Sequence, residues 1–245
     1  MKNWKVSIYL VLTYIAMQIG SIYLGKLLIG YFQSRPGMSE QEAVFNGVAW
    51  SLFTVNLAAS ALFLLFIIPN KKYLKIFTGK KASIGNTILW GFLGFFLALG
   101  GQMLAATIET AMGVELGSEN TAVLSEIARL SPIMLIPMVL FAPFLEEIVF
   151  RRVIFGGVFQ KTNFWIAAIV SGLIFAVVHN ELEHLLMYLM PGLVFSYLYY
   201  RTKRLLAPMI AHFLMNGFVA VVQLNSDKIQ QLQDMKQAFI LFGLH

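Results

Sequence analysis

The chain has 245 residues, of which 58% are hydrophobic and only 12% are charged, and its mean hydropathy is +0.74. A soluble domain carries about twice that share of charged residues, so the composition excludes an ordinary soluble protein and predicts an integral membrane protein. The basic residues behind the formal net charge of +6 lie in short loops between apolar runs. That placement is an orientation signal of membrane proteins and does not indicate nucleic-acid binding. The absence of cysteine excludes disulfides and cysteine-ligated metals.

The apolar runs predict a single integral-membrane domain, residues 1–245, with an all-α fold: a polytopic bundle of about seven or eight transmembrane helices. The first run is too long for the apolar part of a signal peptide, so we expect it to be retained. The stretch Ser39-Glu40-Gln41-Glu42 has the form of a capping box and predicts the start of the second helix. Residues 238–244 are too few to span. The predicted spans are 6–29, 40–68, 86–112, 131–160, 164–179, 185–200 and 205–222, and the motif-bearing core is 131–222.

The charge distribution predicts a cytoplasmic N-terminus. With that orientation, thirteen of the eighteen Lys and Arg residues fall at cytoplasmic ends, and ten of the twelve acidic residues fall at outer ends. The stretch 113–130 is then expected to be an acidic outer loop, and Arg152 is expected to mark the cytoplasmic interface. The two acidic residues that remain, Glu146 and Glu147, lie inside the fourth predicted span.

Glu146 and Glu147 need an explanation because a charge at bilayer depth costs roughly 2.5–3.5 kcal/mol on insertion scales. Arg151 follows Glu147 by four residues, which is the favourable order for a pair on one helix face. We therefore predict that Arg151 holds Glu147 while Glu146 stays available. Pro143, just ahead of both, predicts a kink. The simpler alternative is that both glutamates only join helices.

Polar residues of two other spans are predicted to reach the depth of Glu146. If the fourth and fifth spans form a hairpin that turns near Thr162, Glu146 and His179 both lie about 24 Å from the turn. His212 lies about 12 Å inside the last span, and Asn216 follows on the same helix face. If the hairpin tip protrudes into the cytoplasm, all four residues lie nearer the cytoplasmic side.

This set of side chains suits hydrolysis. A carboxylate and an imidazole can polarise a water molecule and move its proton, and a second imidazole with an amide can donate to the oxyanion of a tetrahedral intermediate. Alternatively, Glu146, His179 and His212 could ligate a divalent metal such as zinc, although the sequence lacks the HExxH signature. Each residue alone is more often a helix–helix hydrogen-bonding group. The shared depth of the four favours a site.

Three motifs resemble those of the CPBP intramembrane proteases, the family of type II CAAX prenyl endopeptidases and bacterial relatives linked to bacteriocin processing and self-immunity (the Abi group). The motifs are Glu146-Glu147-x-x-x-Arg151, Phe175-x-x-x-His179 and His212-x-x-x-Asn216. Their order, their spacing and their placement on separate spans all match across about 70 residues, whereas the first three spans show only generic hydrophobicity.

The resemblance implies an intramembrane fold around a cytoplasm-facing cavity. It implies that Glu146 and His179 activate water and that His212 and Asn216 form the oxyanion hole. The residues with supporting roles would be Glu147, Arg151 and Phe175. The glutamate mechanism requires no cofactor, and a divalent metal is the other mechanism considered for such enzymes.

The predicted function is an intramembrane endopeptidase that hydrolyses a peptide bond of a membrane-associated peptide or protein. The expected partners are membrane lipid and this substrate, which is lipidated in CAAX enzymes but need not be here; no nucleic acid is expected. A non-catalytic self-immunity or scaffold protein with the same fold is the main alternative. A proton-coupled transporter is a weaker one, because it predicts inverted repeats that the sequence does not show.

Overall fold

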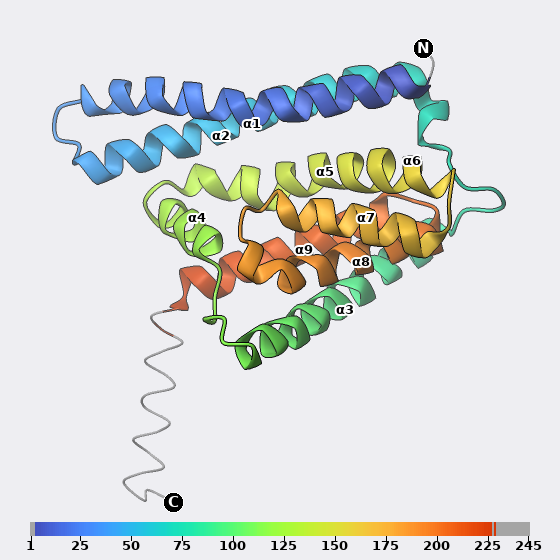
Figure 1. Cartoon of the computed structure of the whole chain (residues 1–245). Helices are drawn as coiled ribbons and strands as arrows, with labels where there is room; N and C mark the ends of the chain where they lie inside the picture. The colour runs from blue at the N-terminus through green and yellow to red at the C-terminus, as the bar shows by residue number, and fades with distance from the viewer. Residues whose placement is uncertain (1–2, 227, 229–245) are drawn as a thin grey trace, which may run out of the picture.

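The computed structural model describes residues 3–226 and 228, and this part of the chain contains helices and no strand. The expected all-α fold is confirmed, and residues 238–244 lie outside the described part. The longer helices, shown in Figure 1, are α1 Asn3–Gln33, α2 Glu40–Ile67, α3 Ile84–Ala111, α4 Glu119–Leu130, α7 Phe164–Val177, α8 Leu185–Thr202 and α9 Leu206–Leu224. The fourth predicted span is a chain of shorter pieces: η2 Pro132–Met134, η3 Pro137–Phe141, α5 Ala142–Glu146, η4 Glu147–Phe155 and α6 Gly156–Phe159.

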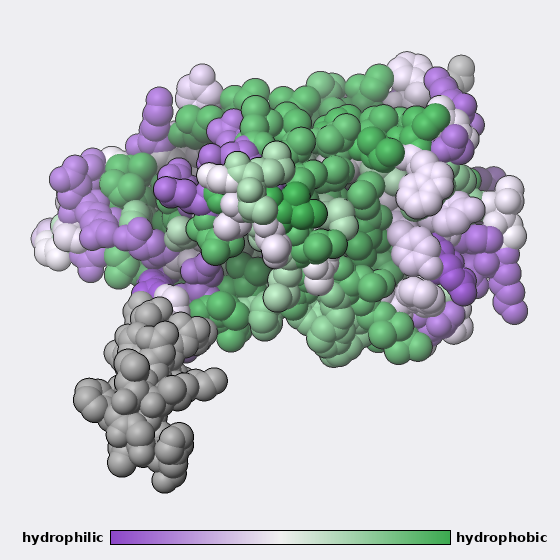
Figure 2. Space-filling view, turned by 60° about the horizontal axis from the view of Figure 1, so that its bottom comes forward, coloured by the Kyte–Doolittle hydropathy of each residue, from purple (hydrophilic) through white to green (hydrophobic). Residues whose placement is uncertain are grey.

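Five of these segments are long and apolar enough to cross a membrane. They comprise Asn3–Gln33, Glu40–Leu74, Ile84–Ala111, Pro132–Phe159 and Leu206–Leu224. α7 is apolar but has only 14 residues, and α8 packs against both α3 and α7. The surface has a hydrophobic middle between two hydrophilic ends (Figure 2), as a membrane-embedded helical bundle requires.

The start of α2 is set by its sequence as expected. The Ser39 side chain accepts a hydrogen bond from the backbone N–H of Glu42, and the Glu42 carboxylate accepts one from the backbone N–H of Ser39. This reciprocal capping box satisfies two N–H groups that would otherwise lack partners at the helix start. The Glu42 carboxylate is fully exposed, and its pKa is lowered by these hydrogen bonds from Ser39.

The prediction of a loop over 113–130 is wrong for most of that stretch, because residues Glu119–Leu130 form α4. Ser118 caps this helix by accepting from the N–H of Thr121, and Glu119 and Arg129 complement the helix dipole at its two ends. The cap at Ser118 and the charges at the two ends of the helix were helix signals present in the sequence. α4 lies across one end of the bundle (Figure 1).

The irregular geometry expected near Pro143 is present as π-helical turns. The N–H of Ala142 donates to the carbonyl of Pro137, five residues back, and residues Glu147–Phe155 continue with π-helical geometry. π-Helical turns inside membrane or soluble helices are rare and often occur at functional sites. Here one π-helical segment, Pro137–Phe141, precedes the short helix that ends at Glu146, and the other, Glu147–Phe155, follows it directly.

α7 and α8 approach each other closely at two glycines. A Cβ atom on Gly192 would lie 3.1 Å from the Cα of Gly172. Small residues at such a crossing allow two backbones to pack tightly inside a membrane. The Gly192 carbonyl is thereby brought toward the fourth span, where Arg151 lies 3.4 Å away.

Several loops meet at the end of the bundle where α1 begins. We call this the basic end; it consists of the start of α1 and residues 68–83, 160–163 and 201–205. The backbone N–H of Ala82 donates to the carbonyl of Thr202, and the Lys203 ammonium donates to the carbonyl of Thr78. The Ser7 and Tyr73 hydroxyls lie 3.0 Å apart. These contacts place loops far apart in the sequence at one level.

The opposite end, which we call the acidic end, consists of residues 34–46, 109–131, 178–186 and 223–226. Gln41 donates to the carboxylate of Glu126 over 3.1 Å, which joins the start of α2 to α4. The Arg129 guanidinium donates to the carbonyl of Gln223, which joins α4 to the end of α9. α4 therefore ties the helices together at this end.

Candidate active site

One cavity of about 450 Å³ lies inside the bundle. Glu146, His179, His212 and Asn216, the four residues that the sequence singled out, all line it, and so does Phe175. These side chains come from α5, the end of α7, and α9. The structure thus brings them to one cavity, although their chemical roles stay predictions.

Glu147 does not line the cavity and is fully buried beside it, together with Arg151. Arg151 Nε lies 3.1 Å from Glu147 Oε2, as expected for the i, i+4 pair. The other carboxylate oxygen, Oε1, lies 2.8 Å from His212 Nδ1. Glu147 therefore connects the arginine to a histidine of another helix, which the sequence had not indicated.

Arg151 is surrounded by aromatic rings in addition to its carboxylate partner. Its guanidinium carbon lies 4.7 Å from the ring centre of Phe175, 5.1 Å from that of Phe195 and 6.0 Å from that of Phe150. A guanidinium over aromatic faces is stabilised by the ring quadrupoles, most strongly where water is excluded. Phe175 thus packs against Arg151 and also lines the cavity, while its supporting role stays a prediction.

His212 lies between two carboxylates. Its Nδ1 faces Glu147, and its Nε2 lies 3.8 Å from Oε2 of Glu146. The ring of Phe195 stacks on the imidazole with centres 4.9 Å apart. Because the ionised carboxylate of Glu147 can only accept, Nδ1 carries a proton, and Nε2 is the ring nitrogen that faces the cavity.

His179 follows the end of α7 and is held by two different contacts. Its Nδ1 lies 2.7 Å from the carbonyl of Phe175. That carbonyl can only accept, so this contact places the proton on Nδ1 and leaves Nε2 free. The ring of Tyr188, from α8, stacks on the imidazole with centres 4.1 Å apart.

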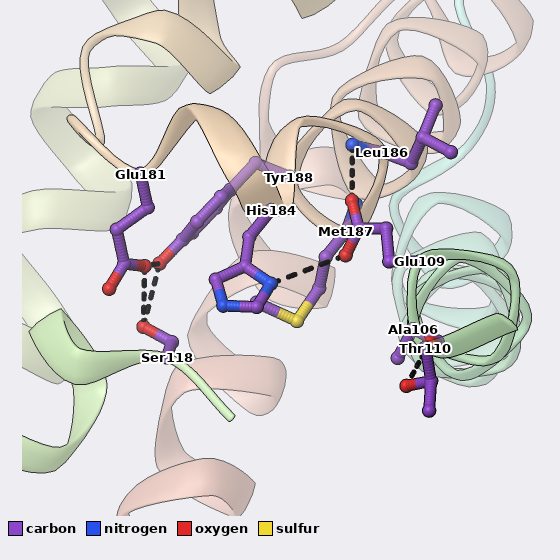
Figure 3. A network of polar contacts seen from close by, with 9 residues as sticks. All are labelled: Ala106, Glu109, Thr110, Ser118, Glu181, His184, Leu186, Met187 and Tyr188. Carbon is purple, nitrogen blue, oxygen red and sulfur yellow. Dashed lines mark hydrogen bonds and ion pairs between the residues drawn. The ribbon is translucent and has the colours of Figure 1, made fainter. Parts of the chain in front are cut away.

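Tyr188 is itself fixed by Glu181, as Figure 3 shows. The Tyr188 hydroxyl donates to the Glu181 carboxylate over 2.6 Å, the Ser118 hydroxyl donates over 2.7 Å, and the backbone N–H of Asn120 donates over 2.8 Å. Burial acts to raise the pKa of Glu181, but these hydrogen bonds outweigh burial and lower the pKa below its ordinary value. Glu181 thus links the start of α4 to the ring that packs on His179.

A second carboxylate in Figure 3, Glu109, fixes the start of α8. Glu109 is buried at the end of α3 and accepts hydrogen bonds from the backbone N–H groups of Leu186 and Met187. His184 Nδ1 lies 3.3 Å from its other oxygen. A carboxylate at a helix N-terminus satisfies free N–H groups and complements the helix dipole. His184 is thus a structural residue.

Asn216 makes a contact that explains its position. Its amide Nδ2 donates to the carbonyl of Met138 over 2.9 Å. In the π-helical pattern, that carbonyl would pair with the residue five positions later, which is Pro143 and has no N–H. Asn216 supplies the missing donor, and the second N–H of its amide remains for another partner.

Arg152, expected at the membrane interface, is not exposed there but packs inside the protein against a residue of the basic end. Its side chain is buried, its Nε donates to the carbonyl of Tyr73 over 2.6 Å, and its guanidinium lies over the Tyr73 ring. Arg152 therefore joins the fourth span to the segment after α2. The lysines at 71–81, by contrast, include exposed residues, as expected of a loop outside the membrane.

None of the residues that line the cavity belongs to the loops of the basic end. The turn between the fourth span and α7 does not protrude, because Phe159 and Phe164 pack against Phe77 and Tyr200 of neighbouring loops and helices. α7 is short, so His179 lies past its far end.

A divalent metal held by Glu146, His179 and His212 stays a prediction. Among the described residues, no group of three or more His, Asp or Glu side chains is placed so that it could hold a metal ion. Nδ1 of each histidine contacts a carbonyl or a carboxylate, and Nε2 of each ring remains for another partner.

Sequence reasoning missed several residues that shape the site. Tyr14 and Asn56, from the first two helices, line the cavity, although those helices had shown only generic hydrophobicity. Phe195 and Tyr188 pack on the two histidines. A polar residue within an apolar run, such as Asn56, was a usable signal, but the aromatic residues were indistinguishable from ordinary packing residues.

Comparison with known proteins adds an independent finding. The family model described as "Type II CAAX prenyl endopeptidase Rce1-like" matches residues 128–218. "Putative membrane peptidase YdiL" of Bacillus subtilis (strain 168) is 36% identical over 238 residues, which is 96% of each chain. "Membrane-embedded CAAX protease MroQ" of Staphylococcus aureus (strain USA300) is 42% identical over 163 residues, which is 64% of each chain. No solved structure matches.

Proposed function

The chain belongs to the Rce1-like CAAX protease family, and from this we propose that it is an intramembrane endopeptidase using a water molecule activated by Glu146. Membership in a peptidase family makes a peptide or protein the substrate class. The substrate is a membrane-associated peptide or protein, and a prenyl group is not required of it. The protein resides in a bacterial plasma membrane with its N-terminus in the cytoplasm.

The observation that carries this proposal is the shared cavity. Glu146, His179, His212 and Asn216 surround one space of about 450 Å³, which is large enough for a peptide segment and for water. Glu146 Oε2 and His212 Nε2 lie 3.8 Å apart across it. A structural role for the four residues would bury them against one another or against apolar side chains, without a common cavity.

In the proposed reaction, Glu146 accepts a proton from water as the water oxygen forms a bond to the carbonyl carbon of the substrate. The carbonyl oxygen becomes an oxyanion, which accepts hydrogen bonds from the second N–H of Asn216 and from Nε2–H of His212; in this step His212 acts as an imidazolium, whose Nδ1–H donates to Glu147. The C–N bond then breaks, and the leaving amine takes up the proton. His179, with Nε2 free, assists the proton movement between water, Glu146 and the amine.

Glu147 and Arg151 act on this reaction indirectly. The Glu147 carboxylate accepts from Nδ1–H of His212, which holds the orientation of the ring and stabilises its imidazolium form, and Arg151 lies beside that carboxylate. Asn216 is oriented by the Met138 carbonyl. Preorganised donors of this kind are worth more than flexible ones, because they need not reorganise as charge develops.

The test uses purified protein in nanodiscs and a library of peptides with hydrophobic anchors. We expect Glu146→Gln to lower the cleavage rate on the order of 10²–10⁴-fold, the range for loss of a general base. Glu183→Gln is the matched control, because Glu183 is an exposed glutamate outside the cavity. Cleavage by Glu146→Gln at the wild-type rate would end the proposal.

The same assay separates the metal-free mechanism from a metal mechanism. We expect the wild-type rate to be unchanged after chelator treatment and dialysis, and unchanged again when zinc is added. Loss of activity on chelation with recovery on zinc would replace the glutamate mechanism while leaving the peptidase assignment in place.

A further inference from the structure

The cavity extends to the acidic end of the bundle. Its lining includes Asn120, Thr121 and Leu124 of α4, Asn180 in the loop after α7, and Met134 at the start of the fourth span. All five lie at or next to the acidic end of the bundle. None of the lining residues comes from the loops at 68–83, 160–163 or 201–205, which form the basic end.

The two ends differ strongly in charge. Among the described residues, the basic end carries ten Lys and Arg residues and no acidic residue: Lys5, Lys71, Lys72, Lys75, Lys80, Lys81, Lys161, Arg201, Lys203 and Arg204. The acidic end carries eight glutamates: Glu40, Glu42, Glu109, Glu115, Glu119, Glu126, Glu181 and Glu183. It carries two basic residues, Arg35 and Arg129, with Lys228 just beyond it in the sequence and Lys26 deeper inside α1.

Arg151 and Arg152 are left out of this comparison because both are buried and paired inside the protein. Without these two arginines, the basic end still carries ten Lys and Arg residues and no acidic residue among the described residues. In bacterial membrane proteins, Lys and Arg in short loops are retained on the cytoplasmic side, whereas acidic residues contribute little to orientation. The ten basic residues therefore fix the basic end in the cytoplasm.

From these two observations we infer that the cavity opens on the outer side of the membrane, and that the protein takes its peptide substrate from that side. The opening is bordered by α4, an amphipathic helix that lies across the acidic end (Figure 1). The inference reverses the direction implied by the sequence resemblance. Its second part rests on the proposed peptidase function, and its first part does not.

The substrate class follows from this geometry. A peptide bond reaches Glu146 by entering past Asn120 and Asn180 from the outer surface. The substrate is therefore an exported or outward-facing segment of a membrane-associated peptide or protein, such as a segment left in the outer leaflet after translocation. A tail that remains in the cytoplasm cannot reach the cavity from the basic end.

Orientation can be measured directly because the chain has no cysteine, so each single-cysteine variant carries one thiol. The variants are Asn120→Cys at the opening, Gln102→Cys in the cavity wall, and Lys80→Cys and Lys161→Cys at the basic end. Intact cells are treated with a charged maleimide that cannot cross the membrane. A second sample is permeabilised first, and labelling of the denatured protein gives the total.

We expect Asn120→Cys and Gln102→Cys to be labelled in intact cells, and Lys80→Cys and Lys161→Cys to be labelled only after permeabilisation. The reverse pattern overturns the inference. Labelling of all four only after permeabilisation overturns it as well. Using two positions at each end protects the result against one variant that fails to fold.

A second measurement separates this inference from the proposed function. A soluble peptide substrate is added to right-side-out and to inside-out membrane vesicles, and we expect cleavage only by the right-side-out vesicles. Cleavage only by inside-out vesicles overturns the inference and leaves the peptidase function intact. Outward labelling without cleavage in either preparation leaves the direction of the cavity intact and overturns the peptidase function.

Discussion

Replacement of Arg151 by methionine tests whether the buried charges around His212 form one unit. Arg151 and Glu147 are both 0% exposed, and their side chains lie 3.1 Å apart. Removing one partner of such a pair leaves an uncompensated buried charge, which typically costs about 3–5 kcal/mol. In a chain of this size, 1 kcal/mol shifts Tm by about 2–4 °C, so we expect Arg151→Met to lower Tm by about 6–20 °C.

The assay is thermal unfolding of the protein in detergent, followed by the intrinsic fluorescence of its four tryptophans. Lys161→Met is the matched control, because Lys161 is an exposed basic residue. Its Tm should stay within about 2 °C of wild type, since surface substitutions away from special features rarely change stability by more than about 0.5 kcal/mol.

The double variant Glu147→Leu with Arg151→Met provides the decisive comparison. With both charges gone, no uncompensated charge is left, so the double variant should be more stable than the sum of the two single losses predicts. Full additivity, or an Arg151→Met protein that unfolds at the wild-type temperature, would refute the reasoning that these two residues stabilise each other.

Three further predictions concern residues outside the motifs. Tyr188→Phe keeps the ring on His179 but loses the hydroxyl that binds Glu181, so we expect a several-fold lower kcat at nearly unchanged KM. Tyr188→Leu also removes the ring, and its kcat should fall much further. Equal kcat values for the two variants would contradict a positioning role. Since hydrogen bonds hold the pKa of Glu181 below 4.5, their stabilisation is complete above that pH and is lost as the pH falls through the lowered pKa. Wild type should therefore lose more Tm than Glu181→Gln between about pH 5 and pH 3; parallel curves would contradict this. Arg152→Met leaves the buried carbonyl of Tyr73 without its donor, which should cost about 1–3 kcal/mol in the same thermal assay, and an unchanged Tm would contradict it.

The sequence determined the class of fold and the candidate site because both depend on local patterns. Long apolar runs predict spans wherever they occur, and the cost of burying a charge marks Glu146 and Glu147 without any knowledge of their neighbours. The pair Glu147–Arg151 and the capping box at Ser39 are fixed by spacing along one helix, and the structure confirms both contacts.

The contacts between helices depend on how each helix is rotated about its axis and on its height in the bundle. The spacing of residues along one helix determines neither. Arg151 was expected to hold Glu147, and the rotation of the fourth span also brings the second carboxylate oxygen of Glu147 to His212. Arg152, as a charged residue near the end of a predicted span, was expected at the membrane interface. The segment after α2 packs against it and accepts its hydrogen bond. Neither contact could be found without the packing of one helix on another.

The direction of the cavity was decided only by the tertiary structure. The sequence placed His179 about 24 Å from the turn before α7, but whether that point lies near one surface or the other depends on the level of the turn. The turn packs level with the other loops of the basic end, and α7 ends at Val177. Hydropathy and charge thus determined which residues lie in the membrane and which end is basic, while the packing of a short helix determined to which end the polar cavity opens.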